Sequence, residues 1–180
     1  PDRKIKQIIP SVRTVAHRII EECMLLANVS AAHFLLKAKI PTLFRDHAAP
    51  AAEKLADLKS FLAELGLRFP NKKTVTPEDY SSLLKLIADR PDAHLIQTVM
   101  LRSLSQAIYS PENIGHFGLA FDAYAHFTSP IRRYPDLLVH RAIRHVLAKR
   151  KAKDFFYDKV TISRLGEHCS TTERRADEAT

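Results

Sequence analysis

Apolar residues recur at helical spacing in several separate stretches of this chain. The longest stretch covers residues 11–38 between Pro10 and Pro41, and it predicts one long helix. Ser11 is placed to cap the start of this helix. Apolar positions occupy most of its circumference, which predicts a helix that is buried on several sides.

Five shorter helices are expected after this one. Gly66 is placed to end the first of them, Thr76 with Glu78 beyond it indicates a helix start, and Pro91 suits a first helical position. The expected ranges are residues 51–65, 77–88 and 92–108, a stretch from Pro130 to about residue 150, and residues 158–178.

The helical periodicity is interrupted between residues 113 and 127. Two glycines and several aromatic residues in this stretch predict one or two short strands, or a hairpin. The order of elements therefore predicts an α+β fold, mostly helical, with a small β element near residues 113–127. A larger sheet is expected to lie outside this chain.

Composition narrows the class of protein. The chain has 180 residues, is 46% hydrophobic and contains only four glycines, which excludes a disordered or low-complexity segment. The net charge of +8 favours a polyanionic partner. We recognise no signal peptide and no long uncharged apolar run, so we expect a soluble, cytoplasmic protein without membrane contact. The two widely separated cysteines fit a reducing compartment.

Residues 124–141 carry the clearest candidate chemistry, and they read YAHFTSPIRRYPDLLVHR. Thr128 and Ser129 stand at an expected helix start, where free backbone N–H groups and the helix dipole favour an anion. Arg132 and Arg133 fall in the same expected first turn. A guanidinium fork can hold a phosphate through two hydrogen bonds, so this spacing predicts a phosphate site.

Aromatic residues beside these groups extend the hypothesis to single-stranded nucleic acid. Tyr124, His126, Phe127 and Tyr134 could stack on bases. An ordinary helix entry explains the same residues, with Thr and Ser caps, Asp136 paired with an arginine, and the aromatic rings in the core. The residues alone leave both interpretations open.

The sequence of this stretch resembles that of a known family. HFTSPIRRYPDLLVHR is similar to the signature of the RNB catalytic domain of the ribonuclease II/R family, and its neighbours bring it closest to the bacterial ribonuclease R branch. Four further blocks resemble the same domain in the same order. They are residues 21–35, 44–50, 90–120 and 168–180.

The resemblance implies that residues 1–180 are the C-terminal part of this catalytic domain, without its N-terminal half, the cold-shock domains and the S1 domain. It implies a processive 3′→5′ exoribonuclease that hydrolyses RNA with Mg²⁺, releases nucleoside 5′-monophosphates and serves RNA degradation. The implied substrates are single-stranded RNA and structured RNA with a 3′ overhang. The aspartates that hold the metal belong to the first half of the domain. We therefore expect no metal ligand in this chain and no activity of the chain alone.

The resemblance also implies roles for individual residues. Arg132 is expected to contact the phosphate near the scissile bond and to offset negative charge in the transition state. Arg133 is expected to position a phosphate. Thr128 and Ser129 are expected to shape the loop and to donate hydrogen bonds to RNA phosphates.

A catalytic glutamate on the long helix is implied as well. It matches either Glu21 or Glu22, and the sequence does not choose between them, although Glu21 shares a helix face with Asn28. Tyr124 and His126 are expected mainly to support the loop and are also candidates for RNA contact. Two other classes stay open, namely a non-catalytic RNA-binding module and a helical interaction domain.

Overall fold

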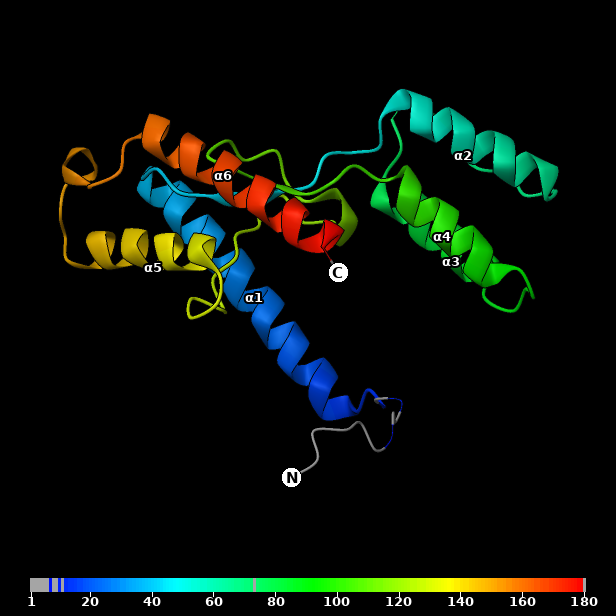
Figure 1. Cartoon of the computed structure of the whole chain (residues 1–180), viewed down its shortest axis with the longest axis horizontal. Helices are drawn as coiled ribbons and strands as arrows, with labels where there is room; N and C mark the ends of the chain where they lie inside the picture. Colours follow the sequence, from blue (N-terminus) through cyan, green and yellow to red (C-terminus); the bar gives the residue numbers. More distant parts are fainter. Residues whose placement is uncertain (1–6, 8–9, 11, 73, 180) are drawn as a thin grey trace.

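The computed structural model describes residues 7, 10, 12–72 and 74–179. Two groups of helices lie side by side, with the extended chain segments between them (Figure 1). Within the described residues, the chain is mostly helical and has one two-stranded sheet, which confirms the α+β fold class. The elements are α1 (Val15–Ala38), β1 (Phe44–Asp46), α2 (Ala52–Glu64), α3 (Pro77–Leu86), α4 (Ala93–Ser103), β2 (Ile108–Ser110), η1 (Phe117–Leu119), α5 (Tyr134–Leu147), η2 (Ala152–Asp154) and α6 (Lys159–Glu178).

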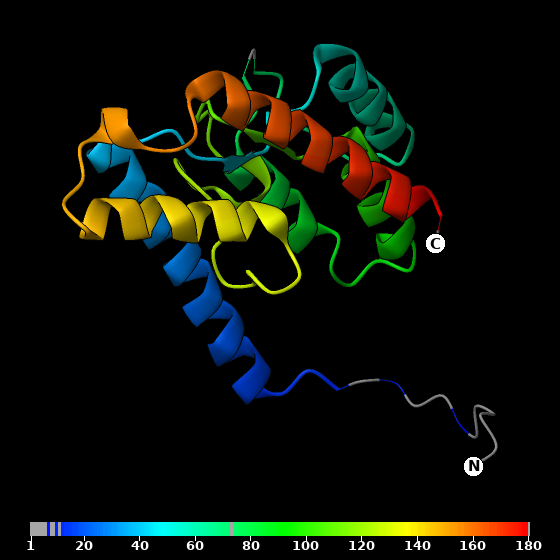
Figure 2. The ribbon, with the colours of Figure 1, turned by 60° about the vertical axis from the view of Figure 1, so that its left-hand side comes forward.

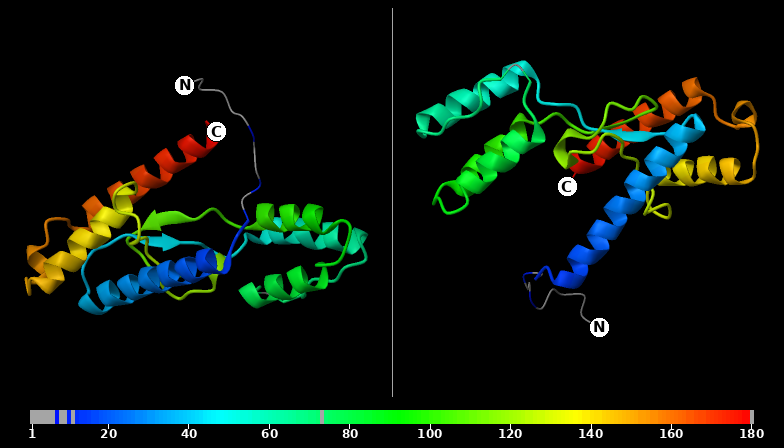
Figure 3. Two further views of the ribbon diagram at one scale, coloured as in Figure 1. Left: turned by 90° about the horizontal axis from the view of Figure 1, so that it is seen from below. Right: turned by 180° about the vertical axis from the view of Figure 1, so that it is seen from behind.

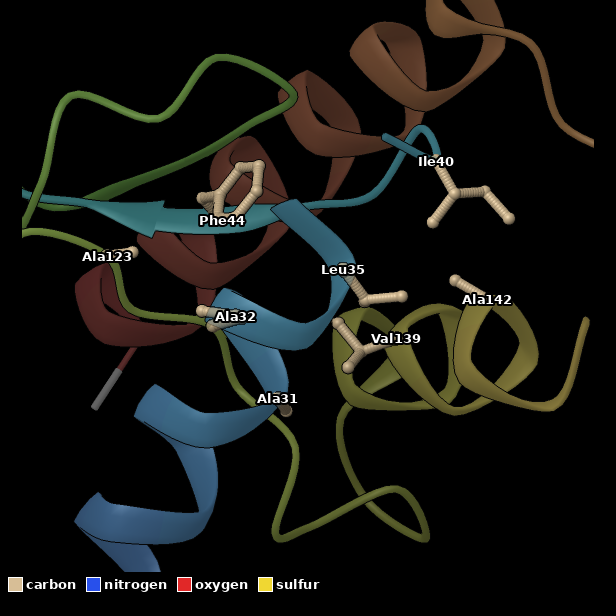
Figure 4. Packing of buried hydrophobic residues seen from close by; sticks show 9 residues of the cluster. Ala31, Ala32, Leu35, Ile40, Phe44, Ala123, Val139 and Ala142 are labelled. Atoms are coloured by element: carbon tan, nitrogen blue, oxygen red, sulfur yellow. The ribbon is translucent and has the colours of Figure 1, made fainter. Parts of the chain in front are cut away.

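The first group comprises α1, α5, α6 and the sheet. The C-terminal half of α1 packs on α5 and β1, as the close view in Figure 4 shows. Small side chains on α1 let the two helices approach closely. The buried cluster contains Ala31, Ala32, Leu35, Ile40, Phe44, Ala123, Ala125, Val139 and Ala142.

The N-terminal half of α1 differs from the prediction. It extends away from the other elements (Figure 2), and large apolar side chains such as Leu26, at 68% exposure, are open to solvent. The expectation of a helix buried on several sides is therefore wrong for this half, because its apolar face has no partner among the described residues. By length and composition alone α1 could also cross a membrane, a test that core helices of soluble proteins pass too.

Thr14 caps the start of α1, and its hydroxyl accepts a hydrogen bond from the backbone N–H of His17. The predicted cap Ser11 lies outside the described residues. In α3, the capping partner of Thr76 is Asp79 rather than Glu78, because Asp79 occupies the N3 position from which its carboxylate reaches back to the Thr76 N–H.

The sheet lies outside the stretch that was expected to contain it. Strand β1 pairs antiparallel with β2, with Phe44 opposite Ser110. Residues 113–127 contribute only isolated bridges and the short helix η1 to the described structure. Gly115 and Ala120 both have positive φ angles, of 83° and 57°, and they turn the backbone before a continuous ladder can form.

The second group consists of α2, α3 and α4, which enclose a separate apolar cluster. It includes Leu58, Leu62, Leu67, Val75, Tyr80, Leu83, Ile87, Ile96 and Met100. Helix α4 ends at Ser103, five residues earlier than predicted, because the backbone becomes extended at Leu104 on the way to β2. The views from below and from behind in Figure 3 show this group beside the sheet.

Helix α6 packs against β2 within the first group. The Ser170 hydroxyl accepts a hydrogen bond from the Tyr109 backbone N–H at 2.9 Å. Arg45 of β1 forms two hydrogen bonds with the Glu173 carboxylate, at 2.7 and 3.2 Å. Helix α6 begins as predicted, with Asp158 accepting a hydrogen bond from the backbone N–H of Thr161.

Candidate functional site

Residues 128–133, called the site turn from here on, lie between α1 and α5. The backbone N–H groups of Arg132 and Arg133 both point to the carbonyl oxygen of Ser129, at 3.3 and 3.0 Å. Helix α5 begins only at Tyr134. The expected helix start just after Pro130 is therefore wrong, and the two arginines do not lie in a first helical turn.

Asn28 of α1 fixes the segment that enters the site turn. Its side-chain oxygen accepts hydrogen bonds from the backbone N–H groups of Phe127 and Thr128, at 2.9 and 3.2 Å. Its amide nitrogen donates to the Tyr124 hydroxyl at 2.9 Å. Asn28 is only 3% exposed, so these bonds are shielded from water. The position of the site turn is thus set by the long helix.

Asp136 of α5 fixes the other side of the site turn. This carboxylate is fully buried, and one oxygen accepts hydrogen bonds from the Ser129 N–H and the Arg133 guanidinium, each at 2.8 Å. The pairing of Asp136 with an arginine, foreseen in the helix-entry interpretation, is therefore present. Arg133 serves mainly to build the site turn, which leaves less of its guanidinium for a ligand.

Three buried polar atoms around the site turn have no hydrogen-bond partner in the described part of the chain. They are the Thr128 hydroxyl, the Arg133 Nε and the second Asp136 carboxylate oxygen. Buried polar groups in proteins are nearly always paired, so such a concentration marks a place that is not arranged for stability alone.

Arg132 has a different environment from Arg133. It is exposed, and the hydrogen bond found for it among the described residues is a long one of 3.5 Å to the Ser129 hydroxyl. Ile131 beside it is fully exposed. The guanidinium of Arg132 is therefore free to bind an anion from solvent.

A cavity of ≈ 300 Å³ is lined by residues of both α1 and the site turn. Glu21 lines this cavity and Glu22 does not, so the geometry favours Glu21 of the two candidates. Arg13 forms an ion pair with Glu21 at the cavity rim. No pattern in the sequence indicated Arg13, which precedes the helix. The lining residues are Arg13, Glu21, Met24, Leu25, Asn28, Tyr124, Thr128 and Arg133.

Tyr124 and His126 support the loop from the interior. The Tyr124 ring is buried and stacks on Phe121, with ring centres 5.8 Å apart. His126 shares a hydrogen bond of 2.9 Å with the Tyr109 hydroxyl. Burial, aided by the charge of Arg133, lowers the pKa of His126 to about 3, so its ring is neutral at pH 7. This packing does not favour base stacking by either residue, and their contact with RNA stays a prediction.

The described residues contain no group of three or more His, Cys, Asp or Glu side chains that could hold a metal ion. Magnesium requires several oxygen ligands in a compact arrangement. The carboxylates around the site turn do not fit this requirement, since Asp136 is buried against Arg133 and Glu21 is paired with Arg13.

Comparison with known proteins gives one consistent family. The RNB domain family matches residues 2–149. Ribonuclease R of Escherichia coli K12 is 54% identical over 99% of this chain and 23% of its own length, and ribonuclease R of Vibrio cholerae is 50% identical over the same shares. The chain thus spans about a quarter of the length of these curated relatives.

Solved structures agree with this result. Mycoplasma genitalium RNase R in complex with ribose-methylated single-stranded RNA has a TM-score of 0.79 at 33% identity, over 91% of this chain and 26% of that one. The complex of the same enzyme with double-stranded RNA has a TM-score of 0.80 at 33% identity, over 91% of this chain and 30% of that one. Yeast Ssd1, described as a pseudonuclease, has a TM-score of 0.74 at 25% identity, over 88% of this chain and 20% of that one.

Proposed function

Because this chain belongs to the RNB domain family, we propose that it is the C-terminal part of the catalytic domain of a ribonuclease R-type exoribonuclease. The whole protein would degrade RNA processively from the 3′ end and release nucleoside 5′-monophosphates. Its substrates would be single-stranded RNA and structured RNA with a 3′ overhang, in the cytoplasm. The Mycoplasma genitalium relative in complexes with single- and double-stranded RNA supports an RNA substrate.

The arrangement of the site turn carries this proposal. Two buried residues, Asn28 and Asp136, hold the turn through its backbone, while Arg132 at its tip stays exposed. A rigid frame that presents a free guanidinium suits the binding of a phosphate whose charge increases during hydrolysis. Arg132 would bind the phosphate at the scissile bond.

Glu21 has a separate role in the proposal. Its carboxylate lines the cavity next to the site turn and could accept hydrogen bonds from the hydroxyls of a terminal ribose. The ion pair with Arg13 would hold this carboxylate beside the cavity. Glu21 would therefore orient the 3′-terminal nucleotide beside the phosphate that Arg132 holds.

Magnesium is proposed as the cofactor of the whole protein. Bound Mg²⁺ would generate the attacking water and stabilise the leaving oxygen. Since the described residues do not fit a magnesium site, its carboxylate ligands would come from another part of the protein.

Substitution of Arg132 in the whole protein tests the proposal. We expect Arg132→Gln to lower the rate of mononucleotide release by about 100- to 1,000-fold, because a group aimed at developing charge contributes chiefly in the transition state. The affinity for oligo(A) should change by less than about tenfold. Single-turnover cleavage and fluorescence anisotropy measure the two quantities. Arg102→Gln, which removes an exposed arginine of α4, is the matched control.

Two results would contradict the proposal. If affinity and turnover fell equally, Arg132 would be a simple binding residue. If the unmodified protein bound RNA but released no mononucleotides, it would be a non-catalytic RNA-binding member of the family, comparable to the pseudonuclease among its structural neighbours.

A further inference from the structure

A second cleft, rich in arginine and aromatic side chains, lies at the C-terminal end of α5. It is lined by residues of that helix end and of the loop that leads through η2 to α6. These two segments lie on the left of Figure 1. Its volume of ≈ 560 Å³ is in the range of small-ligand sites, which is about 300–1,000 Å³. The lining residues are Arg141, Arg144, His145, Ala148, Arg150, Asp154, Phe155, Phe156 and Tyr157.

The loop is held in place by interactions that leave one of its aromatic rings mostly exposed. The buried His145 shares a hydrogen bond of 2.9 Å with the carbonyl oxygen of Lys151. Phe155 packs edge-on against the His145 ring, with centres 5.1 Å apart. The next residue, Phe156, contacts the Tyr157 ring edge-on, with centres 4.9 Å apart, and is 88% exposed. The loop thus presents a large aromatic ring to solvent beside the arginines that line the cleft.

The charge of this cleft is positive. Arg141, Arg144 and Arg150 line it and are exposed, against a single lining carboxylate, that of Asp154. Arg141 donates a hydrogen bond to the hydroxyl of Tyr157, which also lines the cleft. Arginines beside an open aromatic face are the combination with which proteins bind single-stranded nucleic acid.

The cleft is also connected to the site turn along one helix. The Arg141 guanidinium lies 5.9 Å from the centre of the Tyr134 ring, and Tyr134 directly follows the site turn. The same guanidinium lies 6.0 Å from the centre of the Tyr157 ring, which lines the cleft. Arg141 therefore lies between Tyr134 and the cleft. Helix α5 has 14 residues and is therefore about 21 Å long, a distance that a short run of nucleotides can cover.

We infer that this cleft is a second RNA subsite, which binds a nucleotide several positions away from the end held at the site turn. The base stacks on Phe156, and Arg144 and Arg150 bind the neighbouring phosphates. This inference rests on the proposed function, because it takes RNA as the ligand. Beyond the proposed function, the subsite specifies where a longer RNA is bound and which residues bind it.

The experiment measures the affinity of the whole protein for a fluorescein-labelled 20-nucleotide oligo(A), in EDTA to prevent hydrolysis. We expect Phe156→Ala and Phe156→Leu to weaken binding by roughly tenfold or more, because loss of one stacked base costs about 1–3 kcal/mol. Phe156→Trp should bind at least as tightly as the unmodified protein. Phe156→Leu matters because leucine keeps apolar surface but has no aromatic face.

A second variant tests the phosphates independently of the ring. We expect the double variant Arg144→Gln, Arg150→Gln to lower the slope of log Kd against log salt by about 0.7 for each phosphate that the cleft no longer binds. Arg102→Gln on α4 should leave this slope unchanged. The cleft lies away from this control residue, which is not among its lining residues.

The outcomes separate the subsite from the proposed function. Unchanged 20-mer affinity in Phe156→Ala, or full affinity in Phe156→Leu, overturns the subsite even if the unmodified protein releases mononucleotides. Weaker binding together with a lower Tm also overturns it, because the cleft is then a contact surface for another part of the protein. Failure of the unmodified protein to release mononucleotides counts against the proposed function instead, whatever Phe156 does.

Discussion

Among single residues, Asn28 links the long helix to the site turn. It satisfies two backbone donors, those of Phe127 and Thr128, and the hydroxyl of Tyr124, all with one buried amide. These bonds use both the oxygen and the nitrogen of the amide, so a side chain that lacks either function could not make all three. The position of Arg132 therefore depends on an amide in a different element.

Replacement of the Asn28 side chain tests how much this amide contributes to stability. We expect Asn28→Ala to lower the free energy of unfolding by about 2–4 kcal/mol, because it leaves buried donors without acceptors. Ser30→Ala, which changes an exposed residue on the same helix, should change stability by less than about 0.5 kcal/mol. Urea denaturation measures both. Equal stability of the two variants would show that the site turn is held in some other way.

The candidate site was partly predictable at this scale. The signature stretch identified Arg132 and Arg133 together, but their different environments follow from Asp136, which captures Arg133 alone. Glu21 and Glu22 are adjacent in sequence yet about 100° apart around a helix, so only one of them can face the cavity. The shared face of Glu21 and Asn28 was the signal for that choice, and the cavity lies on this face.

At the scale of elements, helix positions were predicted better than helix ends. Pro130 and Pro135 are both acceptable near a helix start, so the local sequence allowed two beginnings for α5. The Asp136 carboxylate decides between them, because it draws the Ser129 N–H into a turn before the helix. The strand β1 was missed for a similar reason. Three residues are too few for a periodic pattern, and their partner strand is about sixty residues away.

The contact between α6 and β2 depends on Gly166. A Cβ atom at this position would lie 2.6 Å from the Tyr109 carbonyl oxygen and 2.9 Å from the Leu43 side chain. Real Cβ atoms do not approach backbone oxygen so closely, so any side chain here must push the helix away from the strand. Ser170 lies one turn further along α6, and its hydroxyl accepts a hydrogen bond from the Tyr109 N–H.

Substitution of Gly166 tests the close contact between α6 and β2. Alanine favours a helix by about 1 kcal/mol over glycine, yet we expect Gly166→Ala to destabilise the protein by about 1–3 kcal/mol because of the steric overlap. Thr171→Ala, an exposed change on the same helix, should be close to neutral. Thermal denaturation compares the two. A higher Tm for Gly166→Ala would mean that α6 can move off the sheet without loss.

For the whole molecule, the exposed half of α1 is the most informative feature. Its apolar residues keep the periodicity of a buried helix, but no described element covers them. Hydrophobic spacing shows what a helix is suited to bury and does not name its partner. Since the chain spans about a quarter of its curated relatives, we expect another part of the whole protein to cover this face.

We expect this 180-residue chain alone to release no mononucleotides from oligo(A) in Mg²⁺, because its described carboxylates form no metal-binding group. The whole protein should release them under the same conditions, and Arg132→Gln in that protein is the control for the site turn. Chromatography of the products measures release. Mg²⁺-dependent release by the chain alone, lost in its Arg132→Gln variant, would show that these residues assemble a complete hydrolytic site, and the division of the active site between two parts of the protein would be wrong.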